Sequence, residues 1–272
     1  MAKAVSARLE EGNYKGAVRL LTSEDVLATP AADTLRTLHE KHPPTPLDRR
    51  PPPPVNAGGS WFTFEEAVVR KAILSFPPGS TGGNDGLTPL HLKDMVMSEG
   101  ASSGLLSGIT SLVNVLMEGV VPEVIRPYLF GGILVALLKK GGGVRPIVVD
   151  LTVRRMASKL VSAQASKLLT STLSPLQMGV GVPRGVEAVV HATRAFVSDL
   201  QPNEVLVKLD FQNAFNSVRR DTILEVAASQ IPEAYPYICS SYAGTSNLRY
   251  EGYYHQRKAF SRAIRWVLYC FV

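Results

Sequence analysis

The sequence is poor in cysteine: Cys239 and Cys270 are the two cysteines in 272 residues, too few for a disulfide framework. This usage fits a reducing compartment. No CxxC pair or Cys/His cluster occurs, which excludes a structural zinc site of the usual spacing. Long apolar runs are also missing. The N-terminus has no signal-peptide core, and the apolar run at residues 259–272 is shorter than the roughly 20 residues of a membrane helix. We expect a soluble intracellular protein, cytoplasmic or nuclear, without membrane contact.

Several common catalytic motifs are absent from the chain. It contains no GxxxxGK[ST] loop, no GxSxG elbow and no HExxH pair. The run GVGVPRG at residues 179–185 differs from the dinucleotide-binding fingerprint because Arg184 takes the place of the third glycine. These absences argue against P-loop nucleotide hydrolases, serine hydrolases of the elbow type and zinc proteases.

The composition of the chain is that of a folded protein with a net positive charge. Hydrophobic residues make up 45% and charged residues 19%, enough to bury a core. The 29 Lys and Arg residues outnumber the 23 Asp and Glu residues, which gives a net charge of +6. A basic balance is compatible with a nucleic-acid partner without requiring one.

Composition divides the chain into an arm, a linker and a globular remainder. Residues 1–41 carry apolar residues at helical spacing around a break at Gly12 and Asn13, which predicts a helical arm. The segment HPPTPLDRRPPPPVNAGGS, residues 42–60, favours polyproline II and predicts a semi-rigid linker or an extended strap over a neighbour. From Trp61 the composition becomes globular.

The globular part predicts an α+β fold with a small sheet rather than a doubly wound parallel one. Helices are expected over residues 64–75, after the glycine-rich loop that follows Phe76, and in GLLSGITSLVNVLMEG. A hairpin is expected in GILVALLKKGGGVRPIVV, apolar helical stripes begin at Val153 and Val186, VLVKLD is expected to be a buried strand, and a helix follows in NSVRRDTILEVAAS.

The run VKLDFQNAFNSV is the first candidate site. An apolar strand would deliver Asp210 to the end of a sheet, where a carboxylate can bind Mg²⁺. The alternative is an aspartate that caps the following turn. Phe215 either faces the same site or packs in the core.

The hairpin KKGGGVRPIVV is the second candidate site. Three glycines allow close approach to a ligand, and Lys139, Lys140 and Arg145 place cations beside it, an arrangement that stabilises polyphosphates. A solvated basic turn is the alternative. Three further cations, Arg154, Arg155 and Lys159, follow on the next predicted helix. Of these, Arg155 and Lys159 share a face at i,i+4 spacing, and we expect all these charges on one nucleic-acid-binding side.

Four segments in order resemble the N-terminal half of a reverse transcriptase of the non-LTR (LINE-type) retrotransposon group. They are GGNDGLTPLHLK, VPEVIRPYLFGGILVALLKKGGGVRPIVV, LSPLQMGVGVPRGVEAVVHATR and VKLDFQNAFNSV. The resemblance covers about residues 61–250. It implies a partial right-hand polymerase: a fingers-like region at 61–200, the start of a palm at 201–250 and a divergent tail at 251–272.

The resemblance also implies roles for single residues in RNA-directed DNA synthesis. Asp210 would bind the catalytic Mg²⁺ pair with the backbone carbonyl of Phe211, and Phe215 would exclude a 2′-OH from the sugar of the incoming deoxynucleoside triphosphate (dNTP). The hairpin and the loop before residue 185 would hold the dNTP and the template-primer; the residues implied are Lys139, Lys140 and Arg145 in the hairpin, and Gln177, Gly179 and Gly181 near the template.

The resemblance is incomplete in a way that affects activity. The family supplies further metal-binding carboxylates from a downstream Tyr-x-Asp-Asp hairpin, and neither that motif nor the preceding Gly-Gln-Gly-Asp-Pro motif is present. We therefore expect a truncated and inactive polymerase-like chain. A non-catalytic nucleic-acid binder and a helical interaction protein remain the alternatives.

Overall fold

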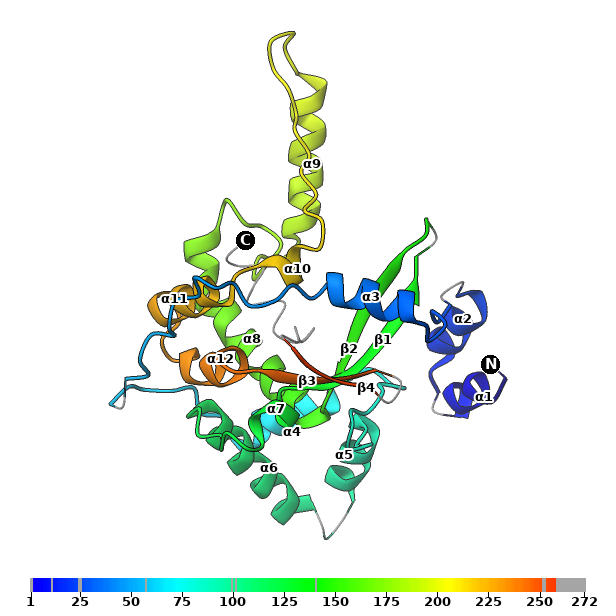
Figure 1. The fold of residues 1–272 in the computed structure, drawn as a ribbon. Coiled ribbons are helices and arrows are strands. Elements are labelled where there is room, and N and C mark those ends of the chain that lie inside the picture. The colour runs from blue at the N-terminus through cyan, green and yellow to red at the C-terminus, as the bar shows by residue number, and fades with distance from the viewer. Residues whose placement is uncertain are drawn as a thin grey trace.

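The structure is a computed structural model that describes residues 2–257 except 11, 24–25, 57, 99, 101, 140 and 251–252. Lys140 and most of the expected tail at 251–272 therefore lie outside the described residues. Helices surround a small mixed sheet (Figure 1), which confirms the α+β class.

Most helices lie where apolar periodicity predicts them. They are α1 (Ala2–Glu10), α2 (Tyr14–Thr22), α3 (Ala32–Glu40), α4 (Glu66–Leu74), α5 (Pro89–Met97), α6 (Ser102–Met117), α7 (Arg126–Leu129), α8 (Thr152–Leu173), α9 (Gly185–Ser198), α10 (Ala214–Ser217), α11 (Arg220–Gln230) and α12 (Tyr235–Tyr242). The first three occupy the predicted arm. Within the part of the chain that the structure describes, no helix combines the length and the apolar character needed to cross a membrane.

The sheet is built on the predicted hairpin. Strands β1 (Gly132–Leu138) and β2 (Val144–Asp150) pair antiparallel, with Arg145 opposite Leu137. Strand β3 (Ser246–Tyr250) lies parallel to β1 and pairs antiparallel with β4 (Tyr253–Arg257), so the order is β2-β1-β3-β4. Residues more than a hundred positions apart thus share one sheet.

Two apolar clusters stabilise this arrangement. The larger joins α4, α5, α6, α8, α11 and α12, and α8 contributes Met156, Ala157, Leu160 and Val161 to it. The smaller cluster lies on one face of the hairpin, where Leu35 and Leu38 of α3 are packed with strand residues such as Leu134 and Ala136. Helix α3 therefore covers this face of the hairpin and leaves the opposite face uncovered by α3.

Residues 42–60 form an extended strap held against α11 and α12. The carboxylate of Asp221 accepts a hydrogen bond from the backbone N–H of Arg50 at 3.1 Å, and Arg219 pairs with Asp48 at 2.9 Å. The hydroxyl of Tyr235 donates to the carbonyl of Pro53. The strap interpretation of this proline-rich segment is therefore the one that the structure matches.

The prediction of a strand at VLVKLD, residues 205–210, is wrong. Residues 204–210 have no regular secondary structure, and Val205 and Leu209 are 77% and 73% exposed. An extended segment becomes a strand only by exchanging backbone hydrogen bonds with a neighbour, and no described strand pairs with this one. A composition rich in β-forming residues is therefore not enough to make this segment a strand.

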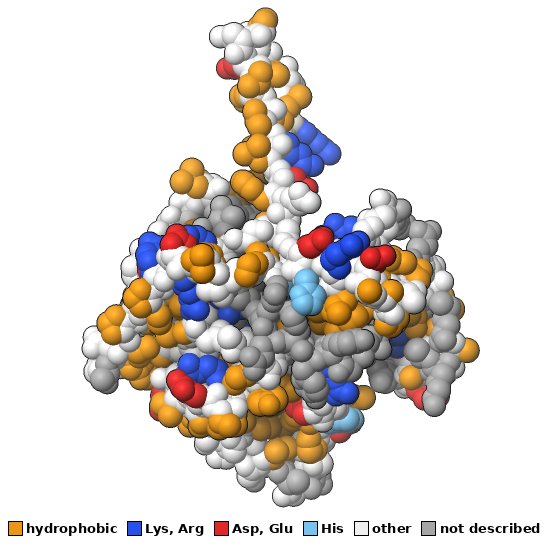
Figure 2. All heavy atoms as spheres, viewed as in Figure 1, with side chains coloured by type: hydrophobic (Ala, Val, Ile, Leu, Met, Phe, Trp, Pro, Cys, Tyr) orange, Lys and Arg blue, Asp and Glu red, His pale blue; other side chains and the backbone are white. Residues whose placement is uncertain are grey.

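Helix α9 and the segment that follows it project from the body of the molecule (Figure 1). Figure 2 shows hydrophobic side chains along this projection. The apolar stripe of α9 is largely exposed: Val186 at 66%, Val189 at 45% and Val197 at 49%. The helix was predicted correctly, but the described part of the chain does not bury the stripe.

Candidate nucleic-acid interface

The basic hairpin turn is closed by backbone hydrogen bonds. The N–H of Lys139 donates to the carbonyl of Gly143 at 3.0 Å, and the N–H of Gly142 donates to the carbonyl of Lys139 at 3.0 Å. Gly142 and Gly143 have φ values of +86° and +82°, which favour glycine over residues with a Cβ. The glycines therefore shape the turn, and the side chain of Lys139 is exposed at its edge.

Arg145 lies on the hairpin face opposite α3. Side chains alternate along a strand, so Arg145 shares a face with Ile147 and Val149, while Val148 belongs to the α3 side. Arg145 is exposed, and no described side chain forms an ion pair with its guanidinium. This cation is therefore available to a ligand.

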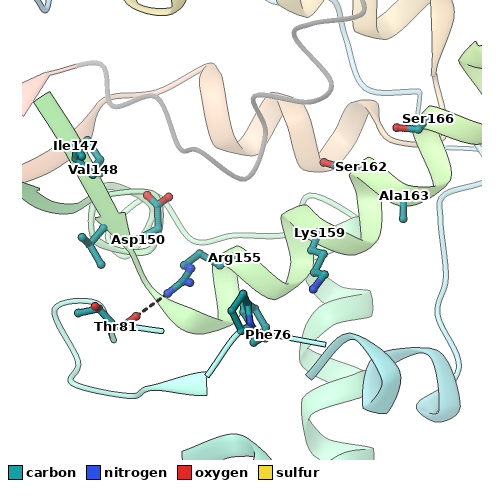
Figure 3. A pocket seen from close by; sticks show the side chains of 12 residues that line it. Phe76, Thr81, Ile147, Val148, Asp150, Arg155, Lys159, Ser162, Ala163 and Ser166 are labelled. Atoms are coloured by element: carbon teal, nitrogen blue, oxygen red, sulfur yellow. Dashed lines mark hydrogen bonds between the residues drawn. The ribbon is translucent and has the colours of Figure 1, made fainter. Parts of the chain in front are cut away.

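A cavity of about 600 Å³ adjoins the same strand (Figure 3). Ile147, Val149 and their strand neighbours form one wall, and Arg155 and Lys159 of α8 form another. Phe76, in the loop after α4, lies against these two cations. The volume is typical of small-molecule sites. The predicted sharing of a face by Arg155 and Lys159 is confirmed, because both line this cavity.

Three cations converge on the segment that begins at Ser75. Lys159 Nζ donates to Ser75 Oγ at 2.6 Å and lies 4.9 Å from the centroid of the Phe76 ring. Arg155 donates to the carbonyl of Thr81 at 2.6 Å, and its Cζ lies 5.3 Å from the same ring centroid. Lys93 of α5 donates to the carbonyl of Phe76 at 2.6 Å.

The surroundings of these cations disfavour their charged forms. Burial lowers the pKa of Lys159 below its usual value, and the positive charges of Lys93 and Arg155 lower it further. Burial also lowers the pKa of Arg155, with a smaller opposing effect from Asp150. The cavity therefore concentrates positive potential, which an anion would relieve.

Arg154 does not belong to this basic surface, contrary to the expectation. Its side chain is fully buried and its Nη1 lies 2.8 Å from the carboxylate of Asp150, which is 2% exposed. The same Nη1 donates to the carbonyl of Phe130. Arg154 falls on the buried side of α8, three residues before Ala157, whereas Arg155 turns toward the cavity.

The expected metal site is not assembled by the described residues. Asp210 and Phe211 are exposed in the irregular segment, and Phe215 is half-buried in α10. Within the described ranges, no group of three or more His, Cys, Asp or Glu side chains could hold a metal ion. One carboxylate and a backbone carbonyl do not fit a two-Mg²⁺ centre, so we derive no chemical step through magnesium.

The predicted template-side residues form the loop between α8 and α9. Gln177 Oε1 accepts a hydrogen bond from the N–H of Gly179 at 2.8 Å. Gly181 has φ +70°, and a Cβ there would lie 2.0 Å from Thr170 Oγ1. Neither this loop nor Asp210 lines the cavity beside the hairpin. Their template role stays a prediction.

Sequence reasoning missed two residues near the Arg155–Lys159 pair: Phe76, which lines the cavity, and Lys93, which lies beside it and contacts the Phe76 carbonyl. They come from segments more than 50 residues before α8; Lys93 closes the segment GGNDGLTPLHLK, but nothing in that segment places it near α8. Only the packing of α4 and α5 against neighbouring helices brings them to Lys159. Their role could not be read from local pattern.

Comparison with known proteins gives one informative similarity. No protein-family model matches the chain. Over 175 residues it is 27% identical to the "Retrotransposable element SLACS 132 kDa protein" of Trypanosoma brucei gambiense. The aligned part is 64% of the chain and 14% of that protein, so the chain spans about a seventh of the relative's length. The chain is thus similar to part of a retrotransposable element protein.

Proposed function

We propose that this chain is a reverse-transcriptase-like segment of a retrotransposon-type element that binds nucleic acid through the face of the β1–β2 hairpin. The observation that carries the proposal is the placement of cations: Lys139 and Arg145 at the exposed end of the hairpin, with Arg155 and Lys159 in the adjoining cavity. The similarity to a retrotransposable element protein supports it. So do the four segments that resemble the fingers and early palm.

Phosphate contacts explain how such a face would act. Each Lys or Arg that neutralises a phosphate releases counterions, so binding is sequence-independent and weakens as salt rises. Arg145 has no described ion-pair partner to give up before it contacts a strand. The half-buried apolar residues of the same face, Ile147 and Val149, can contact sugars and bases.

Fluorescence anisotropy with a labelled single-stranded oligonucleotide tests the proposal. We expect a dissociation constant of about 10⁻⁴–10⁻⁶ M near physiological salt, and tighter binding at low salt. The double variant Lys139→Ala/Arg145→Ala should bind more weakly. A matched control, Lys15→Ala/Arg19→Ala, removes two exposed cations from α2 and should leave binding unchanged. Equal losses in both double variants would contradict a role for the hairpin face.

Nucleotidyl transfer is the activity implied by the resemblance, and we propose that these 272 residues do not perform it alone. The described carboxylates do not assemble a two-metal site. Primer extension on a primed RNA or DNA template in the presence of Mg²⁺ should give no product above background. Product that disappears in Asp210→Asn would refute this part of the proposal.

A further inference from the structure

The cations around Phe76 are held by neutral groups in the part of the chain that the structure describes. Among the described residues no carboxylate forms an ion pair with Lys93, Arg155 or Lys159. These cations contact the hydroxyl oxygen of Ser75, backbone carbonyls and an aromatic ring. The carboxylate that lines the cavity, Asp150, is in a buried ion pair with Arg154, and its charge offsets the effect of burial on the pKa of Arg155 only in part.

These contacts alone do not explain why the side chains are charged. A hydrogen bond to a carbonyl requires a donor but no positive charge, and a neutral donor avoids the penalty of partly burying an ammonium or guanidinium group. Burial lowers the pKa of Lys159, and repulsion by the positive charges of Lys93 and Arg155 lowers it further. The positive charge is therefore in excess of what the loop contacts require.

The cavity has room and free donors for an anion. Its volume of about 600 Å³ exceeds that of a phosphate, and its β2 wall offers apolar surface for a sugar or base. Arg155 uses one N–H group for Thr81, which leaves other N–H groups of its guanidinium for a ligand. Figure 3 shows Arg155 and Lys159 on successive turns of α8 beside Phe76.

We propose that this cavity is a phosphoryl-binding site in which Arg155 and Lys159 contact the phosphate oxygens and Lys93 strengthens the local positive potential. The phosphoryl group belongs either to a free nucleotide or to the backbone of a nucleic-acid strand. If the phosphoryl group belongs to a nucleic-acid strand, this inference rests on the proposed function. If it belongs to a free nucleotide, the inference stands independently of the proposed function.

Charge-neutral variants that keep a hydrogen-bond donor separate binding from loop support. Lys159→Gln and Arg155→Gln remove the charge and keep a neutral, shorter amide donor. Lys167→Gln, an exposed lysine on α8 outside the cavity lining, is the matched control. Inorganic phosphate should raise the thermal midpoint of the wild-type and Lys167→Gln proteins and should have little effect on the two cavity variants. Equal stabilisation of all four proteins would overturn the proposal.

A labelling experiment on the wild-type chain gives an answer even if the variants fold poorly. An amine-reactive reagent, read by mass spectrometry, should modify Lys159 less in inorganic phosphate than in chloride of equal ionic strength, with Lys167 unaffected. Equal modification of Lys159 in phosphate and in chloride would overturn the inference.

Two probes distinguish the source of the phosphoryl group. If the strand is the source, an oligo-dT decamer protects Lys159 at lower concentration than dATP does; the reverse order assigns the site to a free nucleotide. Oligonucleotide binding without phosphate or dATP protection at Lys159 would end the inference and leave the proposed function intact. Protection by dATP without any oligonucleotide binding would contradict the proposed function and leave the nucleotide site.

Discussion

Replacing Asp150 with Asn should strongly destabilise the fold, because it leaves the charge of Arg154 buried without compensation. The two side chains are 2% and 0% exposed and lie 2.8 Å apart. Removing one partner of such a pair lowers the free energy of unfolding by about 3–5 kcal/mol, a large part of the roughly 5–15 kcal/mol that stabilises a typical domain. The change corresponds to about a 10²–10⁴-fold rise in the unfolded fraction.

The effect reaches the candidate interface because this pair joins the end of β2 to the start of α8. Arg154 also donates to the carbonyls of Phe130 and Gly131, so it links the beginning of β1 to the same junction. Loosening this junction should weaken oligonucleotide binding, since Arg155 is the next residue.

Urea unfolding followed by circular dichroism measures the change. Asp94→Asn, an exposed carboxylate on α5, is the control and should alter the free energy of unfolding by less than about 0.5 kcal/mol. Adding Arg154→Met to Asp150→Asn removes the stranded charge and should recover part of the loss. A loss below about 1 kcal/mol in the single variant would refute a buried, charge-paired junction.

Three further predictions concern the strap, the α8–α9 loop and the projecting segment. Asp221→Asn should lower the free energy of unfolding by about 1.5–3 kcal/mol and speed proteolysis of residues 42–60. Because Arg219 holds the pKa of Asp221 well below its usual range, the stabilisation by the Asp221 carboxylate is complete above about pH 4 and is lost as pH falls further. Strap cleavage unchanged by the variant would contradict this. Gly181→Ala should lower the free energy of unfolding by at least about 1–2 kcal/mol, because residue 181 has a left-handed backbone conformation. Urea unfolding compares it with Gly179→Ala, a position without a positive φ, and equal effects of the two substitutions would refute the argument. Leu209→Lys should change stability by less than about 0.5 kcal/mol, and a loss above about 2 kcal/mol would show that this residue is buried.

Local patterns predicted local structure well. The apolar spacing in α6 predicted a helix with one buried face, and Ile109, Val113 and Leu116 are indeed buried. Leu112 falls on the same apolar stripe but is 46% exposed, because a stripe defined by spacing is wider than the contact that neighbouring helices make. The lysine–glycine turn predicted the β1–β2 hairpin for a similarly local reason.

Features that depend on distant partners could not be predicted in the same way. VLVKLD has the composition of a buried strand, yet a strand needs a neighbour and no described one pairs with it. The cavity joins Phe76 to α8 across the sequence, which no spacing rule reports. A signal did exist for Arg154: it lies three and four residues before Ala157 and Ser158, both on the buried side of α8. Helical phase could therefore have separated Arg154 from Arg155.

The salt dependence of oligonucleotide binding tests the central claim most directly. For single-stranded nucleic acid each neutralised phosphate contributes about 0.7 to the slope of log K against log salt concentration. If Lys139 and Arg145 each contact a phosphate, Lys139→Ala/Arg145→Ala should bind more weakly and with a slope shallower by about 1.4 than that of the wild-type chain. Identical slopes and affinities for the two proteins, or no binding by the wild-type chain at low salt, would contradict the assignment of the hairpin face as a nucleic-acid interface.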